Sequence, residues 1–296
     1  MNDATYAMTR ERALLRVTGP DARAFLQGLV SNDVARATPE RAIHAALLTP
    51  QGKFLHEFFI AGLGDALVLE CEAARRDDLK RRLSVYRLRS KVTIEPLDGL
   101  AVLLLYGAAA PERLGLPAEP GAARPLDSGL AFVDPRLAAL GARAWLPEGA
   151  APALLAGLGF APGDLEGYEQ LRLAEGVPDG SRDLPVEKAI LLENGFDELN
   201  GVDWQKGCYM GQELTARTKY RALIRKRLLP VEIDGPAPAP GTPVLQGERE
   251  AGEMRSAAGR RGLALLRLDA LDGPLAAGQA RLAVRRPSWI RLPEAS

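Results

Sequence analysis

The chain of 296 residues is long enough for two or three compact units, and its 47% hydrophobic and 26% charged residues are those of an ordinary globular protein. Its 38 basic and 38 acidic residues cancel. The zero net charge excludes a global field that would attract nucleic acid or an anionic membrane, so any such partner would need a local charged patch.

The first third of the chain predicts strands that alternate with helices. The break Gly19-Pro20 separates the first strand from a helix that Asp21 would cap. A second helix would bury Leu79 and Leu83, and the alternation predicts an α+β fold with a ferredoxin-like unit. The expected strands are 14–18, 45–49, 54–60, 66–71, 92–95 and 101–106.

The second helix carries the one basic patch that stands out, although charge runs of this kind are usually a solvated helix face. It consists of Arg75, Arg76, Lys80, Arg81, Arg82, Arg87, Arg89 and Lys91.

In the rest of the chain the composition and the pattern of apolar residues change twice. Residues 107–125 are rich in alanine, glycine and proline and predict an irregular segment, and Asp164 would cap a helix that ends at Gly176. Past Arg221, short apolar runs alternate with glycine and proline turns, which predicts a small β-barrel or sandwich of about 70 residues.

Two cysteines, Cys71 and Cys208, do not make a disulfide framework, which fits a reducing compartment. Residues 1–5 are polar, and no apolar run reaches the roughly 18 residues that span a bilayer. We therefore expect a cytoplasmic protein with no membrane partner and no direct nucleic-acid partner.

Chemically reactive and polar side chains are most concentrated in residues 206–213, Lys-Gly-Cys-Tyr-Met-Gly-Gln-Glu. A nearby ammonium such as that of Lys206, or a helix start, would favour the thiolate of Cys208. The alternative for Cys208 is a small buried hydrophobe. A cluster held by this chain alone is not expected, because clusters usually take about four thiolates, whereas a site shared with another protein stays open.

This octapeptide resembles the signature of the YgfZ-type folate-binding proteins. They are paralogues of the glycine-cleavage T-protein (GcvT, an aminomethyltransferase) and include the mitochondrial iron–sulfur assembly factor of that family. Residues 15–28 look like the opening strand and helix of the superfamily, and 48–53 resemble the loop that carries the T-protein's catalytic aspartate. The resemblance implies a three-lobed GcvT-like ring: a folate-binding lobe of residues 1–50 plus 108–222, an inserted ferredoxin-like lobe of residues 51–107, and a C-terminal β-barrel of residues 223–296.

The resemblance also implies tetrahydrofolate as the cofactor. Glu187, in Pro-Val-Glu, would accept hydrogen bonds from the amino-pyrimidine edge of the pteridine, and Glu175 is a weaker candidate for that role. Arg217 would hold the glutamate tail. The simpler interpretations are that Glu187 is a surface glutamate and that Arg217 belongs to a basic linker leading into the barrel. The remaining proposed folate contacts are Lys206, Tyr209 and Gln212.

Glu57 would occupy the place of the T-protein's catalytic aspartate, with His56 beside it as a possible acid–base partner. Its side chain is one methylene longer, and active sites tolerate a misplacement of about 1 Å poorly. A zinc site is not expected, because His44 and His56 are the only histidines and lack the required spacing.

The implied function is support of iron–sulfur cluster assembly or repair, with effects on cluster enzymes such as those that modify tRNA. Cys208 would be the redox-active or cluster-facing group, and the partners would be iron–sulfur assembly proteins or cluster-containing clients. One alternative is a folate-dependent aminomethyltransferase, one-carbon transferase or demethylase with Glu57 as its acidic group. Another is a scaffold that recruits assembly partners and uses folate only as a structural ligand.

Overall fold

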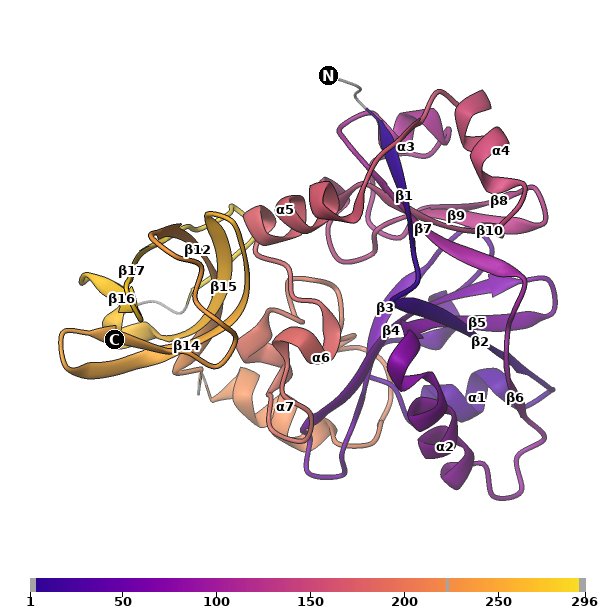
Figure 1. The fold of residues 1–296 in the computed structure, drawn as a ribbon. Helices are drawn as coiled ribbons and strands as arrows, with labels where there is room; N and C mark the ends of the chain where they lie inside the picture. Colours follow the sequence, from indigo (N-terminus) through magenta and orange to yellow (C-terminus); the bar gives the residue numbers. More distant parts are fainter. Residues whose placement is uncertain (1–3, 222–223, 293–296) are drawn as a thin grey trace. The chain divides into compact units, whose positions relative to one another are not determined.

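The computed structural model describes residues 4–221 and 224–292 (Figure 1). The chain forms two compact units, and each is described by itself. Unit 1 comprises Met1–Leu48, His56–Tyr168 and Leu199–Met210, and unit 2 comprises Thr49–Leu55, Glu169–Glu198 and Gly211–Ser296. Residues 1–3 and 222 of the predicted folate-binding lobe, and residues 223 and 293–296 of the predicted barrel, lie outside the described residues.

Two sheets build unit 1. The six-stranded sheet has the order β11-β1-β7-β10-β9-β8, and the five-stranded sheet has the order β3-β4-β5-β2-β6. The strands of the first are β1 (Thr5–Thr9), β7 (Leu100–Tyr106), β8 (Ala123–Leu126), β9 (Gly129–Val133), β10 (Ala142–Pro147) and β11 (Ala161–Pro162). Those of the second are β2 (Arg12–Thr18), β3 (Ile43–Leu48), β4 (Phe54–Leu63), β5 (Ala66–Glu72) and β6 (Thr93–Pro96).

Aromatic side chains from the two sheets pack against each other. Phe59 of β4 lies 6.3 Å from Phe132 of β9, whose ring meets Trp145 of β10 edge-on at 5.0 Å, measured between ring centroids. Edge-to-face pairs of this kind add stabilisation beyond the burial of their area. The strands β3 and β4 are buried along almost their whole length, His44, His56 and Glu57 included, so buried and exposed side chains do not alternate along them.

Helices α1 (Ala22–Gln27), α2 (Arg76–Tyr86) and α5 (Leu165–Glu175) occupy the three positions predicted for helices, with one correction, and the other four α-helices of the described residues were not predicted. Asp164 caps α5 by accepting a hydrogen bond from Gly167 N at 2.7 Å, as predicted. Asp21 makes no side-chain cap for α1; its carboxylate instead accepts from Lys91 N at 2.7 Å, since the chain returns to that point. The α-helices are α1 (Ala22–Gln27), α2 (Arg76–Tyr86), α3 (Ala110–Arg113), α4 (Ala151–Gly157), α5 (Leu165–Glu175), α6 (Gly180–Asp183) and α7 (Gln212–Tyr220). Short 3-10 helices cover Val34–Arg36, Ala73–Arg75, Ala138–Leu140, Leu191–Asn194 and Leu268–Ala270.

In unit 2, six strands close into a barrel in the order β12-β15-β14-β13-β16-β17. Its interior is filled by Leu229, Met254 and Leu266 among other apolar side chains. The α+β class and the C-terminal β-barrel predicted from the sequence are confirmed. The strands are β12 (Lys226–Asp234), β13 (Pro243–Gln246), β14 (Arg249–Ala258), β15 (Arg261–Arg267), β16 (Leu275–Ala277) and β17 (Ala280–Val284).

Two differences from the sequence-based expectations concern boundaries. Helix α3 and strand β8 interrupt the segment 107–125 that was expected to be irregular. The five-stranded sheet extends beyond the range 51–107 predicted for the inserted lobe, because β2 and β3 precede residue 51 and supply two of its strands. The second difference arises because β2 joins the sheet through β5, a partner distant in the sequence, which local patterns do not reveal.

Candidate functional site

Cys208 lies at the tip of an exposed turn in unit 1. Both Gly207 and Cys208 are exposed, and a Cβ added at Gly207 would meet no heavy atom within 4 Å. We call residues 203–210 the Cys208 turn. The exposed Cys208 is accessible to a reagent or to another protein.

The ammonium of Lys206 anchors one side of the Cys208 turn. Its Nζ donates to the backbone carbonyls of Gln27 at 2.8 Å, Val30 at 2.6 Å and Asn32 at 2.9 Å. These three bonds use every N–H of a lysine ammonium. Burial lowers the pKa of Lys206 to about 8, while Asp33 and Asp203 oppose that shift, so the side chain is still an ammonium at neutral pH. A direct folate contact by Lys206 would have to replace one of these bonds.

Tyr209 and the backbone anchor the other side of the turn. The Tyr209 ring is buried and lies 5.1 Å from the Lys206 ammonium, within range of a cation–π interaction. Met210 N donates to Gly28 O at 3.1 Å. At the start of the turn, the Asp203 carboxylate accepts from Gln205 N and Lys206 N, an Asx turn that aspartate forms readily. The exposed Cys208 therefore stands on a base that is fixed at both ends.

The sequence-based prediction missed the acceptors of this base. They are the carbonyl of Gln27, the last residue of α1, and those of Val30 and Asn32 in the loop that follows, where the sequence shows only a polar run, Ser31-Asn32-Asp33. Asp203 was recognisable as a turn residue three positions before Lys206. A hollow of about 290 Å³ in unit 1 adjoins the loop and is lined by Asn32, Arg36, Arg41, Ala42, Ile43, His44, Glu119, Pro120, Pro135, Asn200 and Val202.

Glu187 lies in unit 2, where its backbone is held by the loop 49–55. Phe54 N donates to Ala189 O at 3.0 Å, and Glu187 N donates to Phe54 O at 2.8 Å. Glu187 has a φ of +61° and an exposed side chain. An L-residue in the left-handed region is uncommon outside asparagine and aspartate, and such strain is often found at ligand-binding sites.

The same loop contacts the start of α7. Gly52 has a φ of +82°, and a Cβ added there would lie 2.7 Å from Gly211 O, at the N-terminus of the helix. Helix α7 carries two of the predicted folate contacts, the partly exposed Gln212 and the exposed Arg217. The loop 49–55 therefore contacts the Glu187 segment through Phe54 and the start of α7 through Gly52.

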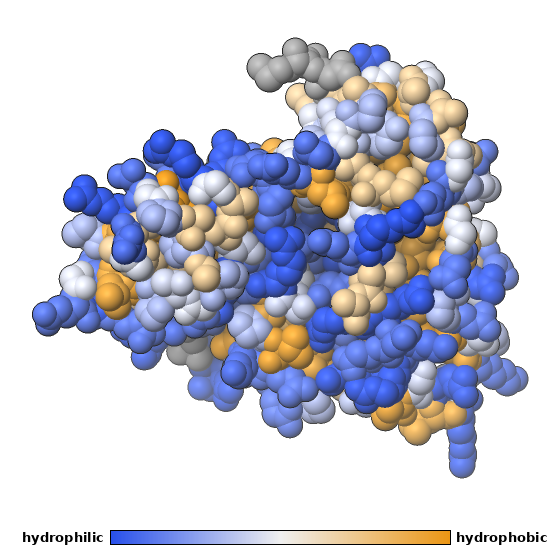
Figure 2. All heavy atoms as spheres, in the orientation of Figure 1, coloured by the Kyte–Doolittle hydropathy of each residue, from blue (hydrophilic) through white to orange (hydrophobic). Residues whose placement is uncertain are grey.

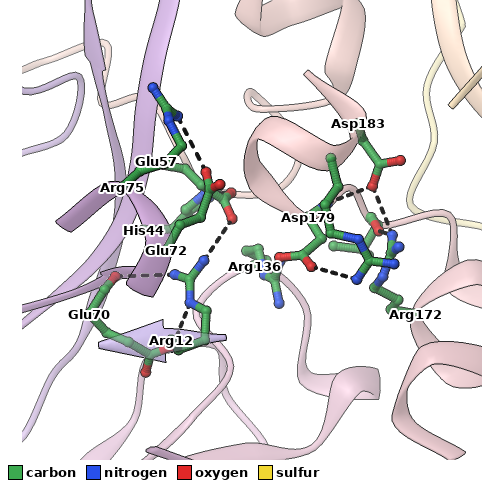
Figure 3. Close-up of polar contacts among 12 residues, drawn as sticks. Arg12, His44, Glu57, Glu70, Glu72, Arg75, Arg136, Arg172, Asp179 and Asp183 are labelled. Carbon is green, nitrogen blue, oxygen red and sulfur yellow. Dashed lines mark hydrogen bonds and ion pairs between the residues drawn. The ribbon is translucent and has the colours of Figure 1, made fainter. Parts of the chain in front are cut away.

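A buried guanidinium fixes the chain just before Glu187. Arg172 of α5 donates to the Asp183 carboxylate at 2.9 Å and to Val177 O at 3.1 Å, and Figure 3 shows Asp179 and Asp183 close to it. Asp179 N also donates to Asp183, at 2.8 Å. These contacts fix the segment 177–183 that leads to Glu187.

Glu175, the weaker folate candidate, is half-buried near the end of α5. Burial raises the pKa of its carboxyl group, and its backbone carbonyl accepts from Trp289 Nε1 at 2.7 Å. Its position is thus set by the C-terminal segment of the same unit.

Glu57, predicted as the catalytic acid, lies in the interior of unit 1 and is 1% exposed (Figure 3). Its carboxylate is 3.2 Å from His44 Nε2 and 3.6 Å from a guanidinium nitrogen of Arg12. Burial alone would raise the pKa of Glu57, but the bond from His44 and the charges of Arg136 and Arg12 lower it overall. Because Cys208 is exposed and Glu57 is enclosed, the two predicted catalytic residues do not share one exposed site.

His56, the suggested partner of Glu57, faces a different residue. Its Nε2 is 2.9 Å from the Asp78 carboxylate on α2, and burial lowers its pKa to about 4. His56 is therefore neutral at physiological pH and fastens α2 to β4. Within residues 4–221 and 224–292, no three His, Cys, Asp or Glu side chains form a group that could hold a metal ion.

Comparison with known proteins gives consistent results. The chain is 39% identical to the human "Iron-sulfur cluster assembly factor IBA57, mitochondrial" over 94% of this chain and 83% of that protein, and 38% identical to the mouse protein over 89% and 78%. Residues 225–292 match the family described as the CAF17 C-terminal beta-barrel domain. The fold is similar to the glycine cleavage aminomethyltransferase T of Bartonella henselae, with a TM-score of 0.78 and 16% identity over 97% of this chain and 86% of that one.

One expectation is overturned by these comparisons. The human, mouse and fungal relatives are named as mitochondrial proteins, which contradicts the cytoplasmic location predicted from the sequence. A low cysteine count indicates a reducing environment but does not say which compartment supplies it. Among the helices that the structure describes, none is long and apolar enough to cross a membrane.

Proposed function

Because the chain belongs to the IBA57 family of iron–sulfur cluster assembly factors, we propose that it supports the assembly or repair of iron–sulfur clusters through the thiol of Cys208. The observation that carries this proposal is the exposed Cys208 on a base fixed by Lys206 and Tyr209. A thiol held outward in this way can donate one ligand to a cluster whose other ligands come from a partner protein. The affected clients would include cluster enzymes such as those that modify tRNA.

Tetrahydrofolate is the small molecule that we propose for unit 2. Support comes from the strained backbone and exposed side chain of Glu187, and from the exposed Arg217 on α7. A carboxylate suits the paired N–H donors of the pteridine, and a guanidinium suits the carboxylates of the glutamate tail. The finer YgfZ-type assignment belongs to the same proposal and depends on the octapeptide 206–213.

The test of the cluster role compares cysteine variants in cells that lack this protein. Cys208→Ser should abolish the activity of cluster-dependent enzymes, while Cys71→Ala, a change at a buried thiol, should preserve most of it. Both variants must accumulate to the wild-type level for the comparison to count. Full rescue by Cys208→Ser would refute the proposed role of the thiol.

The test of the folate role is calorimetric titration with tetrahydrofolate. Glu187→Gln keeps the size of the side chain but removes the charge, and it should weaken binding by about tenfold to a hundredfold, as expected when one charged hydrogen-bonding partner is lost. Glu119→Gln, a change at another exposed glutamate, is the matched control. Wild-type protein that does not bind tetrahydrofolate would remove the folate proposal and leave the cysteine proposal standing.

The enclosure of Glu57 argues against the alternative of an aminomethyltransferase. An acid that acts on a substrate must come within hydrogen-bond reach of it, and the Glu57 carboxylate is buried against His44 and Arg12. The similarity to a T-protein at 16% identity concerns the fold alone.

A further inference from the structure

The end of α2 and the turn that follows it in unit 1 expose apolar side chains that no role described above uses. Val85 is 64% exposed, Tyr86 is 39% exposed and Leu88 is 88% exposed. Figure 2 shows hydrophobic and hydrophilic side chains side by side at the lower right, where Figure 1 places the end of α2. We call residues 85–91 the α2 tip.

Leu88 adopts a backbone conformation that leucine normally avoids. Ser90 N donates to Arg87 O at 2.8 Å, which closes a tight turn, and Leu88 inside that turn has a φ of +43°. Glycine, asparagine or aspartate is the usual residue at such a position. A strained leucine that is also exposed gains nothing from packing within its own chain, so its presence calls for a role outside the fold.

The α2 tip is held firmly despite this strain. Arg87 N donates to Ser84 O at 3.2 Å, and the Arg87 guanidinium donates to Val92 O at 3.4 Å. On the far side, Lys91 N donates to the Asp21 carboxylate at 2.7 Å. Leu88 is therefore presented outward by an ordered turn and is not part of a loose loop.

The charge of this region is strongly positive in a chain whose net charge is zero. Residues 76–91 contain seven basic and two acidic residues, a net of +5. Of the two acids, Asp78 is already engaged by Arg82 and His56. In the part of the chain that the structure describes, neither Arg89 nor Lys91 forms an ion pair, so both cations are available to a partner.

We propose that the α2 tip binds an anionic lipid surface, with Leu88 and Val85 entering the interfacial region and Arg87, Arg89 and Lys91 meeting lipid phosphates. An apolar apex beside cations is the arrangement that binds membrane surfaces by burial and charge together. A partner helix groove fits less well, because its ligands present anchors at i, i+3, i+4 and i+7, whereas Leu88 lies beyond the end of α2. This proposal is independent of Cys208 and of folate.

The experiment is co-sedimentation of the full chain with phosphatidylcholine vesicles that contain or lack phosphatidylglycerol. Binding should require phosphatidylglycerol and should weaken as salt is raised. Leu88→Gly should lower the partition coefficient by about tenfold, the order expected for losing one leucine from an apolar environment. Arg89→Glu with Lys91→Glu, which leaves the bond from Arg87 to Val92 O in place, should lower it by more than about a hundredfold, because each charge near an anionic surface contributes several-fold.

Two controls distinguish binding through the α2 tip from nonspecific binding of the protein to vesicles. Leu245→Ser changes an exposed apolar residue of the barrel, and Arg281→Glu with Arg286→Glu changes two exposed cations; both should bind like wild type. Leu88→Gly also relieves the backbone strain, so it should unfold no more easily than wild type and its loss of binding cannot be ascribed to misfolding.

Three results would overturn the proposal. The first is no sedimentation with anionic vesicles, and the second is undiminished binding by both α2-tip variants. The third is capture of soluble polyglutamate through Arg89 and Lys91 without any vesicle binding, which would favour an acidic protein as the partner of this surface.

Discussion

The Nζ of Lys206 donates to the backbone carbonyl of Val30 at 2.6 Å, the shortest of three such bonds that join the Cys208 turn to the end of α1 and the loop after it. The lysine was expected to favour a thiolate by its charge. Its observed bonds give it a different role, because they direct its three N–H groups to carbonyl oxygens. Lys206 therefore acts on Cys208 by fixing the position of its turn, and not by placing a positive charge beside the thiol.

Replacing Lys206 by methionine should therefore destabilise the protein and loosen the Cys208 turn. Three carbonyls would lose a charged donor, and bonds to charged groups contribute about 1.5–3 kcal/mol each without adding fully, so a loss of about 3 kcal/mol is expected in urea unfolding. Hydrogen exchange of the Met210 amide, which is bonded to Gly28 O, should become faster. Lys206→Arg should not rescue, because a planar guanidinium cannot address three carbonyls arranged around an ammonium.

The matched control is Lys219→Met. Lys219 pairs with Asp197 at 3.0 Å on a surface where both side chains are 35% exposed, and such pairs contribute about 0–1 kcal/mol. Equal small effects of the two lysine variants would contradict the anchoring role of Lys206.

The two thiols should differ sharply in reactivity. Cys208 is exposed, whereas Cys71 is buried in β5, where desolvation raises its pKa to about 12. Native protein treated with iodoacetamide should therefore be alkylated once, at Cys208, and twice only after unfolding. Mass spectrometry of the intact chain and of its peptides measures this directly. Rapid double alkylation without denaturant would show that the interior of unit 1 opens easily.

Stability should fall in acid because Asp134 is ionised inside the protein. Burial alone would raise the pKa of Asp134, but Arg136 and Arg143 outweigh it and lower the pKa to about 2. A carboxyl group with a lowered folded-state pKa stabilises the protein above its unfolded value near 3.8, and that stabilisation is lost as the pH falls toward 2. The contribution is roughly 2 kcal/mol.

Urea titrations between neutral pH and pH 2 check this prediction. Glu57 and Glu70, whose pKa values are also lowered, should add to the same loss. Asp134→Asn should be less stable than wild type at neutral pH and should lose less stability on acidification. The same pH dependence in wild type and Asp134→Asn would mean that other carboxylates carry the effect.

The barrel and the alternating strands and helices were predictable because their signals are local: apolar runs, glycine and proline turns, and caps such as Asp164. The base of the Cys208 turn was not predictable, because the acceptors of Lys206 lie 174 to 179 residues away in the sequence. The enclosure of Glu57 was hidden for the same reason, since Arg12 and His44 reach it from other strands. Sequence patterns nominated the candidate residues, and only the fold decided which of them are exposed.

Glycine in place of Glu187 should separate stability from folate binding. At a φ of +61° an L-residue costs about 1–2 kcal/mol relative to glycine, partly offset by the entropy that glycine loses on folding. Glu187→Gly should thus be as stable as wild type or slightly more so. If the carboxylate contacts the pteridine, the same variant should bind tetrahydrofolate at least about tenfold more weakly.

Asp127 offers a matched control for this substitution, since it is another exposed acid with a positive φ, +51°. Asp127→Gly should gain less stability than Glu187→Gly, because aspartate tolerates a positive φ, and should keep full affinity for tetrahydrofolate, measured by thermal unfolding and calorimetry on the same samples. Glu187→Ala should lose affinity without the gain in stability, because alanine retains the Cβ strain. If Glu187→Gly bound tetrahydrofolate as tightly as wild type, the strained glutamate would need an explanation other than folate.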